Sequence, residues 1–134
     1  MINYENEFFQ KTRFAPEQVL QFLASAEKDL GIAQGSDIAE VIFKFSYDAL
    51  IKIGIALIAR DGYKVRSQTG HHVRIIERMS QILADEDIVI IGNKMRRERN
   101  IDLYSGGSSI SGKDSNEYLS FVLNILNKIK ASLK

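Results

Sequence analysis

The chain has 134 residues, 45% of them hydrophobic and 26% charged, which predicts a single globular domain over residues 1–134 with a core of ordinary size. The formal net charge is only +1, so the chain as a whole is not built to attract nucleic acid, and any anion-binding surface has to be local. The absence of cysteine excludes a disulfide framework and thiolate zinc sites, and it is consistent with a reducing cytoplasm.

The first fourteen residues are mixed in character. Residues 1–7 are acidic and lack the basic and apolar regions of a signal peptide, so we expect a cytoplasmic protein. Phe8, Phe9 and Phe14 predict that this arm packs against the body of the protein or against a partner. The most apolar run, residues 51–59, contains a lysine and is too short to span a bilayer, so no membrane association is expected.

A first helix is predicted after this arm. Pro16 stands where a helix can begin without a free N–H group. Apolar residues at helical spacing follow it, until Gly31 or Gly35 ends the element.

A second and longer helix is predicted from Asp37 to about Arg60. Asp37 and Glu40 have the spacing of a capping box, with Asp37 as the N-cap, and Gly62 is a plausible stop. The helix is apolar nearly all round, so it is either a core helix enclosed by its own fold or one that also packs against a second copy of the chain. Gly54 in its middle would permit a close helix crossing.

Three more helices are predicted after a polar connection over residues 61–70. Helical periodicity places them at about 71–83, from 85–87 to about 104, and after a cap formed by Ser111 and Asp114. No segment shows an alternation of apolar and polar residues clear enough to predict a strand. Only Val65 and residues 88–91 could belong to one. The sequence therefore predicts an all-α, up-and-down bundle of about five helices joined by short loops.

The densest cluster of cations lies in residues 94–104. This segment is expected to be the second half of the fourth helix, where residues four apart share a face. Arg96, Asn100 and Tyr104 would then form one polar column, which is suited to face an anion. The alternative is that the cations are solvated and complement the C-terminal end of the helix dipole, by about 0.3–1 kcal/mol each.

His71 and His72 are the two histidines of the chain. Adjacent residues on a helix project about 100° apart, so the pair is not suited to hold one metal ion, and neither a metal site nor a cofactor is predicted. A structural role would leave one histidine packed and the other capping the helix or facing solvent. A functional role would use a near-neutral pKa for proton transfer, or for an RNA contact beside Arg96 and Arg99.

Three of these features together resemble the HEPN domain superfamily. They are the long apolar second helix, the Gly70-His71-His72 entry to the third, and the run Arg96-Arg97-Glu98-Arg99-Asn100-x-x-x-Tyr104 in the fourth. The resemblance covers most of the chain, from the second helix to the fifth. The family signature is an arginine, then a polar residue, then a histidine four to six residues after the arginine. Arg99 and Asn100 match its first two positions, and Tyr104 stands where the histidine is expected.

The resemblance implies a function as well as a fold. Members are compact helical bundles that commonly dimerise with both motifs facing one cleft, and many are metal-independent ribonucleases. This implies an endoribonuclease that acts as a toxin beside a nucleotidyltransferase-type antitoxin, or in another defence system. The RNA 2′-hydroxyl would attack its own phosphodiester, while the arginine stabilises phosphoryl charge and the histidine transfers protons. The implied catalytic residues are Arg99, Asn100 and Tyr104, and the implied RNA-binding residues are Lys94, Arg96, Arg97, His71 and His72.

Tyr104 is where the chain departs from the family signature. A tyrosine with its ordinary pKa of about 10 is a weak base at neutral pH, although it can donate a hydrogen bond or act as an acid. The alternative function is a non-catalytic module that binds RNA or an acidic partner protein. A third hypothesis is a structural adaptor, in which the basic column only serves the end of its helix. We expect a homodimer through the second and fourth helices.

Overall fold

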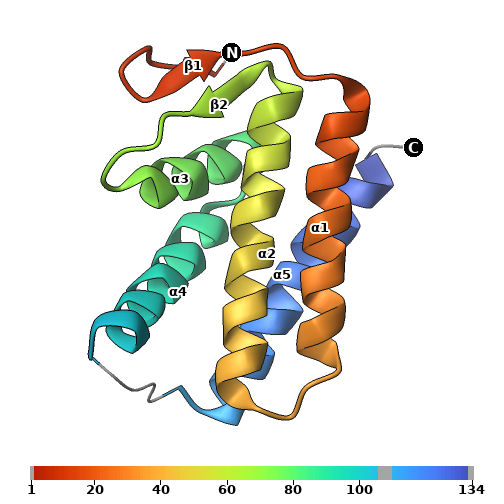
Figure 1. Ribbon diagram of the computed structural model, residues 1–134, viewed down its shortest axis with the longest axis vertical. Helices are drawn as coiled ribbons and strands as arrows, with labels where there is room; N and C mark the ends of the chain where they lie inside the picture. The colour runs from red at the N-terminus through yellow and green to blue at the C-terminus, as the bar shows by residue number, and fades with distance from the viewer. Residues whose placement is uncertain (1, 106–109, 133–134) are drawn as a thin grey trace.

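The computed structural model describes residues 2–105 and 110–132 of the chain, except for the side chains of residues 102–105 and 132 (Figure 1). Within these residues it has five helices and one two-stranded sheet, so the predicted all-α bundle is confirmed. The elements follow the order β1 (Phe9–Lys11), α1 (Pro16–Gln34), α2 (Ala39–Arg60), β2 (Tyr63–Val65), α3 (His71–Leu83), α4 (Glu86–Ser105) and α5 (Gly112–Ser132). None of the described helices is long and apolar enough to cross a membrane.

Helix α2 occupies the middle of the bundle. It contacts α1 and α5 on one side and α3 and α4 on the other, and α3 lies across it rather than along it (Figure 1). Most of its apolar residues are buried within the single chain, among them Phe43, Leu50, Ile53, Leu57 and Ile58, whereas Val41, Phe45 and Ile55 are only partly buried. Enclosure by its own fold therefore accounts for most of the apolar character of α2.

Two glycines allow the helices to approach α3 closely. A Cβ atom placed on Gly54 of α2 would lie 2.4 Å from Cγ2 of Ile75 and 2.7 Å from Sδ of Met79. A Cβ atom on Gly92 of α4 would lie 2.8 Å from Cγ2 of Ile76. The close crossing predicted at Gly54 is confirmed, and a similar one holds α4 against α3.

The N-terminal arm packs on the body of the protein, as predicted. The β1 strand pairs with β2 in antiparallel fashion, with Phe9 opposite Val65, and the Phe9 side chain is buried. The Arg74 guanidinium stands 3.5 Å from the centre of the Phe8 ring. The expectation of no strand is thus wrong at residues 9–11 and at residues 63–65. A strand at Val65 had been left open, and one at residues 9–11 had not. Strands of three residues are too short to show alternation.

The ends of the helices test the capping predictions. Gly35 caps α1, and the Ser111 hydroxyl accepts a hydrogen bond of 3.0 Å from the Asp114 N–H at the start of α5. The predicted cap at Asp37 is wrong, because α2 begins two residues later with Ile38 at the N-cap position. The Ser36 hydroxyl accepts a hydrogen bond of 3.1 Å from the Ile38 N–H, which holds this segment outside the helix.

Candidate functional site

A pocket of about 400 Å³ lies where the start of α3 meets the second half of α4. Its lining includes both histidines of α3 and, from α4, Arg96, Arg99 and Asn100. Because α4 packs on α3 through Gly92, the two segments that carry these residues are held side by side. The fold therefore brings five of the residues singled out in the sequence into one pocket.

The two arginines give the pocket a positive wall. Both side chains are half-buried, and neither forms an ion pair with any carboxylate in the described part of the chain. Nε of Arg96 donates a hydrogen bond of 3.2 Å to Oδ1 of Asn93, and the Arg99 guanidinium lies 5.8 Å from the centre of the Tyr47 ring. Guanidinium groups that lack a carboxylate partner are well suited to bind phosphate oxygens.

His72 is held by a tyrosine from the central helix. Nδ1 of His72 lies 2.9 Å from the hydroxyl of Tyr47, whose side chain is 1% exposed. Burial raises the pKa of Tyr47 to about 12, although the nearby charges of Arg99 and Arg96 act to lower it. Tyr47 therefore stays protonated at neutral pH and serves as an uncharged hydrogen-bond partner for the imidazole.

The same surroundings keep His72 neutral. Burial, followed by the positive charges that His71 and Arg99 place beside it, lowers the pKa of His72 to about 4. A neutral imidazole can accept a proton, and it would hold that proton weakly. His72 is thus an uncharged group at neutral pH, and as a base it is weaker than an ordinary histidine.

His71 is oriented by the connection before α3. Its Nδ1 lies 3.0 Å from the carbonyl oxygen of Gln68, which can only accept, so Nδ1 carries the hydrogen and donates it. The His71 and His72 rings meet edge to face, with their centres 4.5 Å apart. Nε2 of His71 is therefore the nitrogen that remains for a ligand.

Two of the predicted RNA-binding residues lie outside this pocket. Lys94 and Arg97 are exposed on α4 and do not line it. The charge of Arg97 instead acts on Tyr118 of α5. Burial and the charge of Glu98 raise the pKa of Tyr118, and the charge of Arg97 opposes that rise. The side chain of Tyr104, the predicted end of the polar column, lies outside the described residues.

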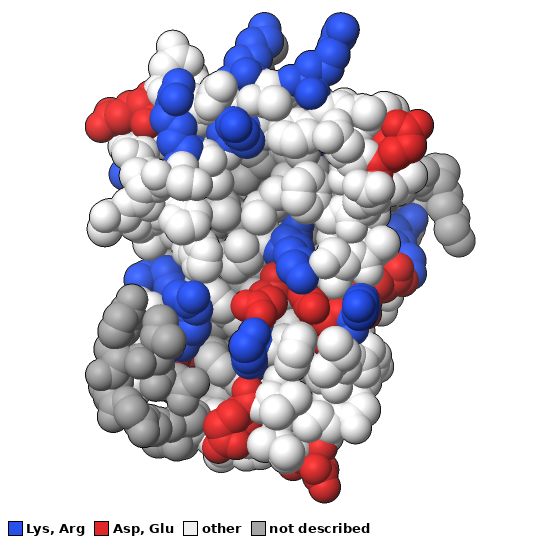
Figure 2. Space-filling model, in the orientation of Figure 1, with Lys and Arg blue, Asp and Glu red and all other residues white. Residues whose placement is uncertain are grey.

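The charged side chains on the face drawn in Figure 2 are unevenly arranged. Basic side chains gather at the top of this face, around β1 and β2, and a smaller group stands at its left over α4, whereas acidic and basic side chains mix over the lower half (Figure 2). This local gathering agrees with a net charge of only +1. Among residues 2–105 and 110–132, no three histidine, aspartate or glutamate side chains are grouped so that they could hold a metal ion.

Sequence reasoning missed Tyr47 as a part of this site. Tyr47 stands between Ser46 and Asp48 on a helix with several polar residues, so no local signal in the sequence marked it. Neither a family model, nor a curated protein, nor a solved structure matches the chain. The chemistry of the pocket is therefore the basis for a functional proposal: two guanidinium groups and two imidazoles that converge on one space.

Proposed function

We propose that the protein is a HEPN-like, metal-independent endoribonuclease whose active site is the pocket between α3 and α4. One observation carries the proposal: Arg96 and Arg99 line the same pocket as His71 and His72. Guanidinium groups can stabilise the charge of a phosphodiester under attack, and imidazoles can move the protons. These groups are sufficient for RNA cleavage that uses the 2′-hydroxyl as its nucleophile.

The proposed reaction is an internal transfer of the phosphoryl group. His72 accepts the proton of the 2′-hydroxyl while that oxygen forms a bond to phosphorus. The bond from phosphorus to the 5′-oxygen breaks, and protonated His71 gives its proton to that leaving oxygen. Arg96 and Arg99 stabilise the negative charge on the non-bridging oxygens. The products are a 2′,3′-cyclic phosphate and a 5′-hydroxyl.

The remaining family expectations belong to the same proposal. The protein would act as a toxin beside a nucleotidyltransferase-type antitoxin, and Asn100 and Tyr104 would assist as the polar residue and as a proton donor. The proposed homodimer would use α2 and α4, and on α4 the side chains of Ile90 and Ile101 are 63% and 48% exposed. Growth arrest on induction of the wild type, relieved by Arg99→Ala, would support the toxin role.

The decisive experiment measures cleavage of an unstructured RNA in the presence of a metal chelator. Loss of one group that stabilises transition-state charge typically lowers the rate by about 100-fold or more, and we expect this for Arg99→Ala. Arg97→Ala is the matched control, because it removes the same charge two residues away on the same helix and outside the pocket. Cyclic-phosphate ends, identified by mass spectrometry, would establish the 2′-hydroxyl as nucleophile. Equal loss in both variants, or a requirement for added metal, would refute the proposal.

A second candidate function is RNA binding without cleavage. The presence of Tyr104 at the histidine position of the family signature favours it, because tyrosine is a weak base at neutral pH. This function predicts RNA recovered intact after incubation and an affinity that falls as salt concentration rises. Arg99→Ala would weaken the affinity, and Arg97→Ala would change it less. A structural adaptor would show neither cleavage nor RNA binding.

A further inference from the structure

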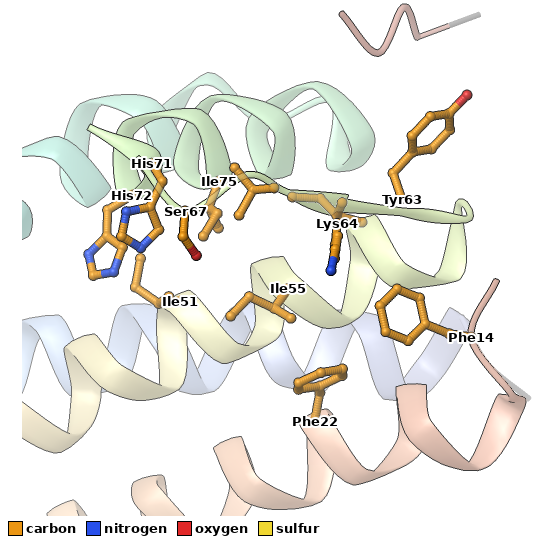
Figure 3. A pocket seen from close by; sticks show the side chains of 12 residues that line it. Phe14, Phe22, Ile51, Ile55, Tyr63, Lys64, Ser67, His71, His72 and Ile75 are labelled. Carbon is orange, nitrogen blue, oxygen red and sulfur yellow. The ribbon is translucent and has the colours of Figure 1, made fainter. Parts of the chain in front are cut away.

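A second pocket shares His71 and His72 with the candidate active site. Its volume is about 330 Å³, and it lies between α1, α2, β2 and the start of α3. Figure 3 shows the two histidines at one end of it and the rings of Phe14 and Phe22 at the other. The histidine pair is therefore a wall common to two pockets of different character.

The walls of this second pocket are mostly apolar and partly aromatic. Ile51 and Ile55 of α2 form one side, and the rings of Phe14 and Phe22 meet edge to face with their centres 6.3 Å apart. Aromatic and branched aliphatic walls favour a flat ligand with apolar faces. A nucleobase has such faces, and single-stranded nucleic acids are commonly bound by stacking of their bases.

The polar groups of the pocket favour a ligand with acceptor atoms and negative charge. The Ser67 hydroxyl points into the space, and the Lys64 side chain extends toward Ile55 (Figure 3). Lys64 forms no ion pair with a carboxylate among the described residues. The carbonyl and ring-nitrogen acceptors of a base can pair with such donors, and a backbone phosphate can pair with the ammonium group.

We propose that this pocket binds one unpaired base of the RNA substrate, beside the phosphodiester held by Arg96 and Arg99. The inference rests on the proposed ribonuclease function and specifies its substrate as single-stranded RNA. A base stacked in a duplex cannot enter the pocket, so cleavage would be confined to unpaired RNA. Lys64 would contact the phosphate of the nucleotide next to the bound base.

The test compares nucleotides with phosphate alone on the full-length chain. The probes are the four nucleoside 3′-monophosphates and inorganic phosphate, and their affinities are measured by NMR titration. We expect at least one nucleotide to bind about tenfold more tightly than inorganic phosphate, because stacking adds to the charge interaction. Ser67→Trp, which fills the pocket from an exposed position, should remove this preference and leave phosphate binding unchanged.

Control variants separate occupation of the pocket from other effects. Asn127→Trp adds the same ring at an exposed position on α5 and should keep the nucleotide preference. Lys64→Ala should weaken binding of an RNA trinucleotide more than Lys28→Ala, which removes an exposed lysine from α1. A nucleotide preference that survives Ser67→Trp would overturn the base pocket.

The outcomes for this pocket and for the ribonuclease are distinct. Equal affinity of the wild type for all four nucleotides and for inorganic phosphate would overturn the base pocket and leave RNA cleavage intact. Cleavage inside a stable RNA duplex at the rate seen for unpaired RNA would also overturn it. Failure of the wild type to cleave any RNA would refute the ribonuclease, while a nucleotide preference removed by Ser67→Trp would still support the base pocket.

Discussion

Helices α2 and α4 both pack on α3 through a glycine, yet they serve the molecule differently. Helix α2 is surrounded by the other elements, and its side chains form much of the core. Helix α4 lies at the side of the bundle, where Ile88 and Met95 are buried while Ile90 and Ile101 are exposed. The enclosed helix supplies stability, and the peripheral helix supplies arginines that a ligand can reach. Substitutions on the two helices should therefore affect different measurements.

Gly54→Ala is expected to have the largest effect on stability. The added Cβ would overlap Cγ2 of Ile75, which is fixed in the core and cannot rotate away, whereas Met79 is flexible enough to yield. Overpacking of this kind costs about 1–3 kcal/mol, and the better helix propensity of alanine offsets about 1 kcal/mol of it. We expect a net loss of up to about 2 kcal/mol in the free energy of unfolding, measured by urea denaturation.

Gly31→Ala is the control for that measurement. A Cβ at Gly31, also inside a helix, would meet no atom within 4 Å. Alanine should stabilise the protein there by about 0.5–1 kcal/mol. Stabilisation by both substitutions would show that α2 and α3 separate easily, and it would remove the contrast between the two helices.

The partly buried His72 should make the protein less stable in acid. The unfolded chain binds a proton at His72 below a pKa of about 6.5, whereas the folded chain does so only below about 4. Between these values the unfolded state holds more protons, so the free energy of unfolding decreases as the pH falls. Because the ring is half-exposed and solvent screens its charge, the loss should be on the order of 1 kcal/mol.

The measurement is the free energy of unfolding from pH 7 to pH 4, for the wild type and for His72→Gln. The variant lacks the titrating group, so its stability should fall less over this range. Identical pH dependence in the two proteins would show that protonation of His72 does not oppose folding.

Gly92→Ala is expected to be less harmful than Gly54→Ala. Its added Cβ would lie 2.8 Å from Cγ2 of Ile76, a longer approach than the one at Gly54, and α4 has fewer neighbours to prevent a small shift. We expect a loss of up to about 1 kcal/mol in the free energy of unfolding. A small shift of α4 would also move Arg96 and Arg99 relative to the histidines, so RNA cleavage should decrease more than stability does. A variant with full activity and a larger stability loss than Gly54→Ala would reverse the comparison.

Arg99→Ala should have the smallest effect on stability. The guanidinium is half-buried and lies 5.8 Å from the Tyr47 ring centre, a contact worth roughly 0.5 kcal/mol. The free energy of unfolding should therefore change by about 0.5 kcal/mol or less, as measured by the same urea denaturation. A loss of RNA cleavage in this variant would then reflect the chemistry of the pocket. A stability loss comparable to that of Gly54→Ala would instead assign Arg99 a structural role.

The sequence by itself determined the helices, because their signals are local. Apolar residues recur at helical spacing, and Pro16 and Ser111 mark helix starts whatever the rest of the chain does. The all-round apolar character of α2 also indicated a central position. Before α2, two residues that can cap a helix, Ser36 and Asp37, stand side by side. The sequence did not show which of them would accept the hydrogen bond, and the predicted start of the helix was wrong by two residues.

Only the tertiary structure decided which of these helices' residues meet. Periodicity gives the faces of a helix, but the rotation of α4 against α3 depends on the packing of Gly92 and Ile76. That rotation turns Arg96 and Arg99 toward the histidines and leaves Arg97 outside their pocket. The contact of Tyr47 with His72 and the pairing of β1 with β2 also join segments far apart in the chain. Such contacts depend on the packing of the whole core, which no short stretch of sequence encodes.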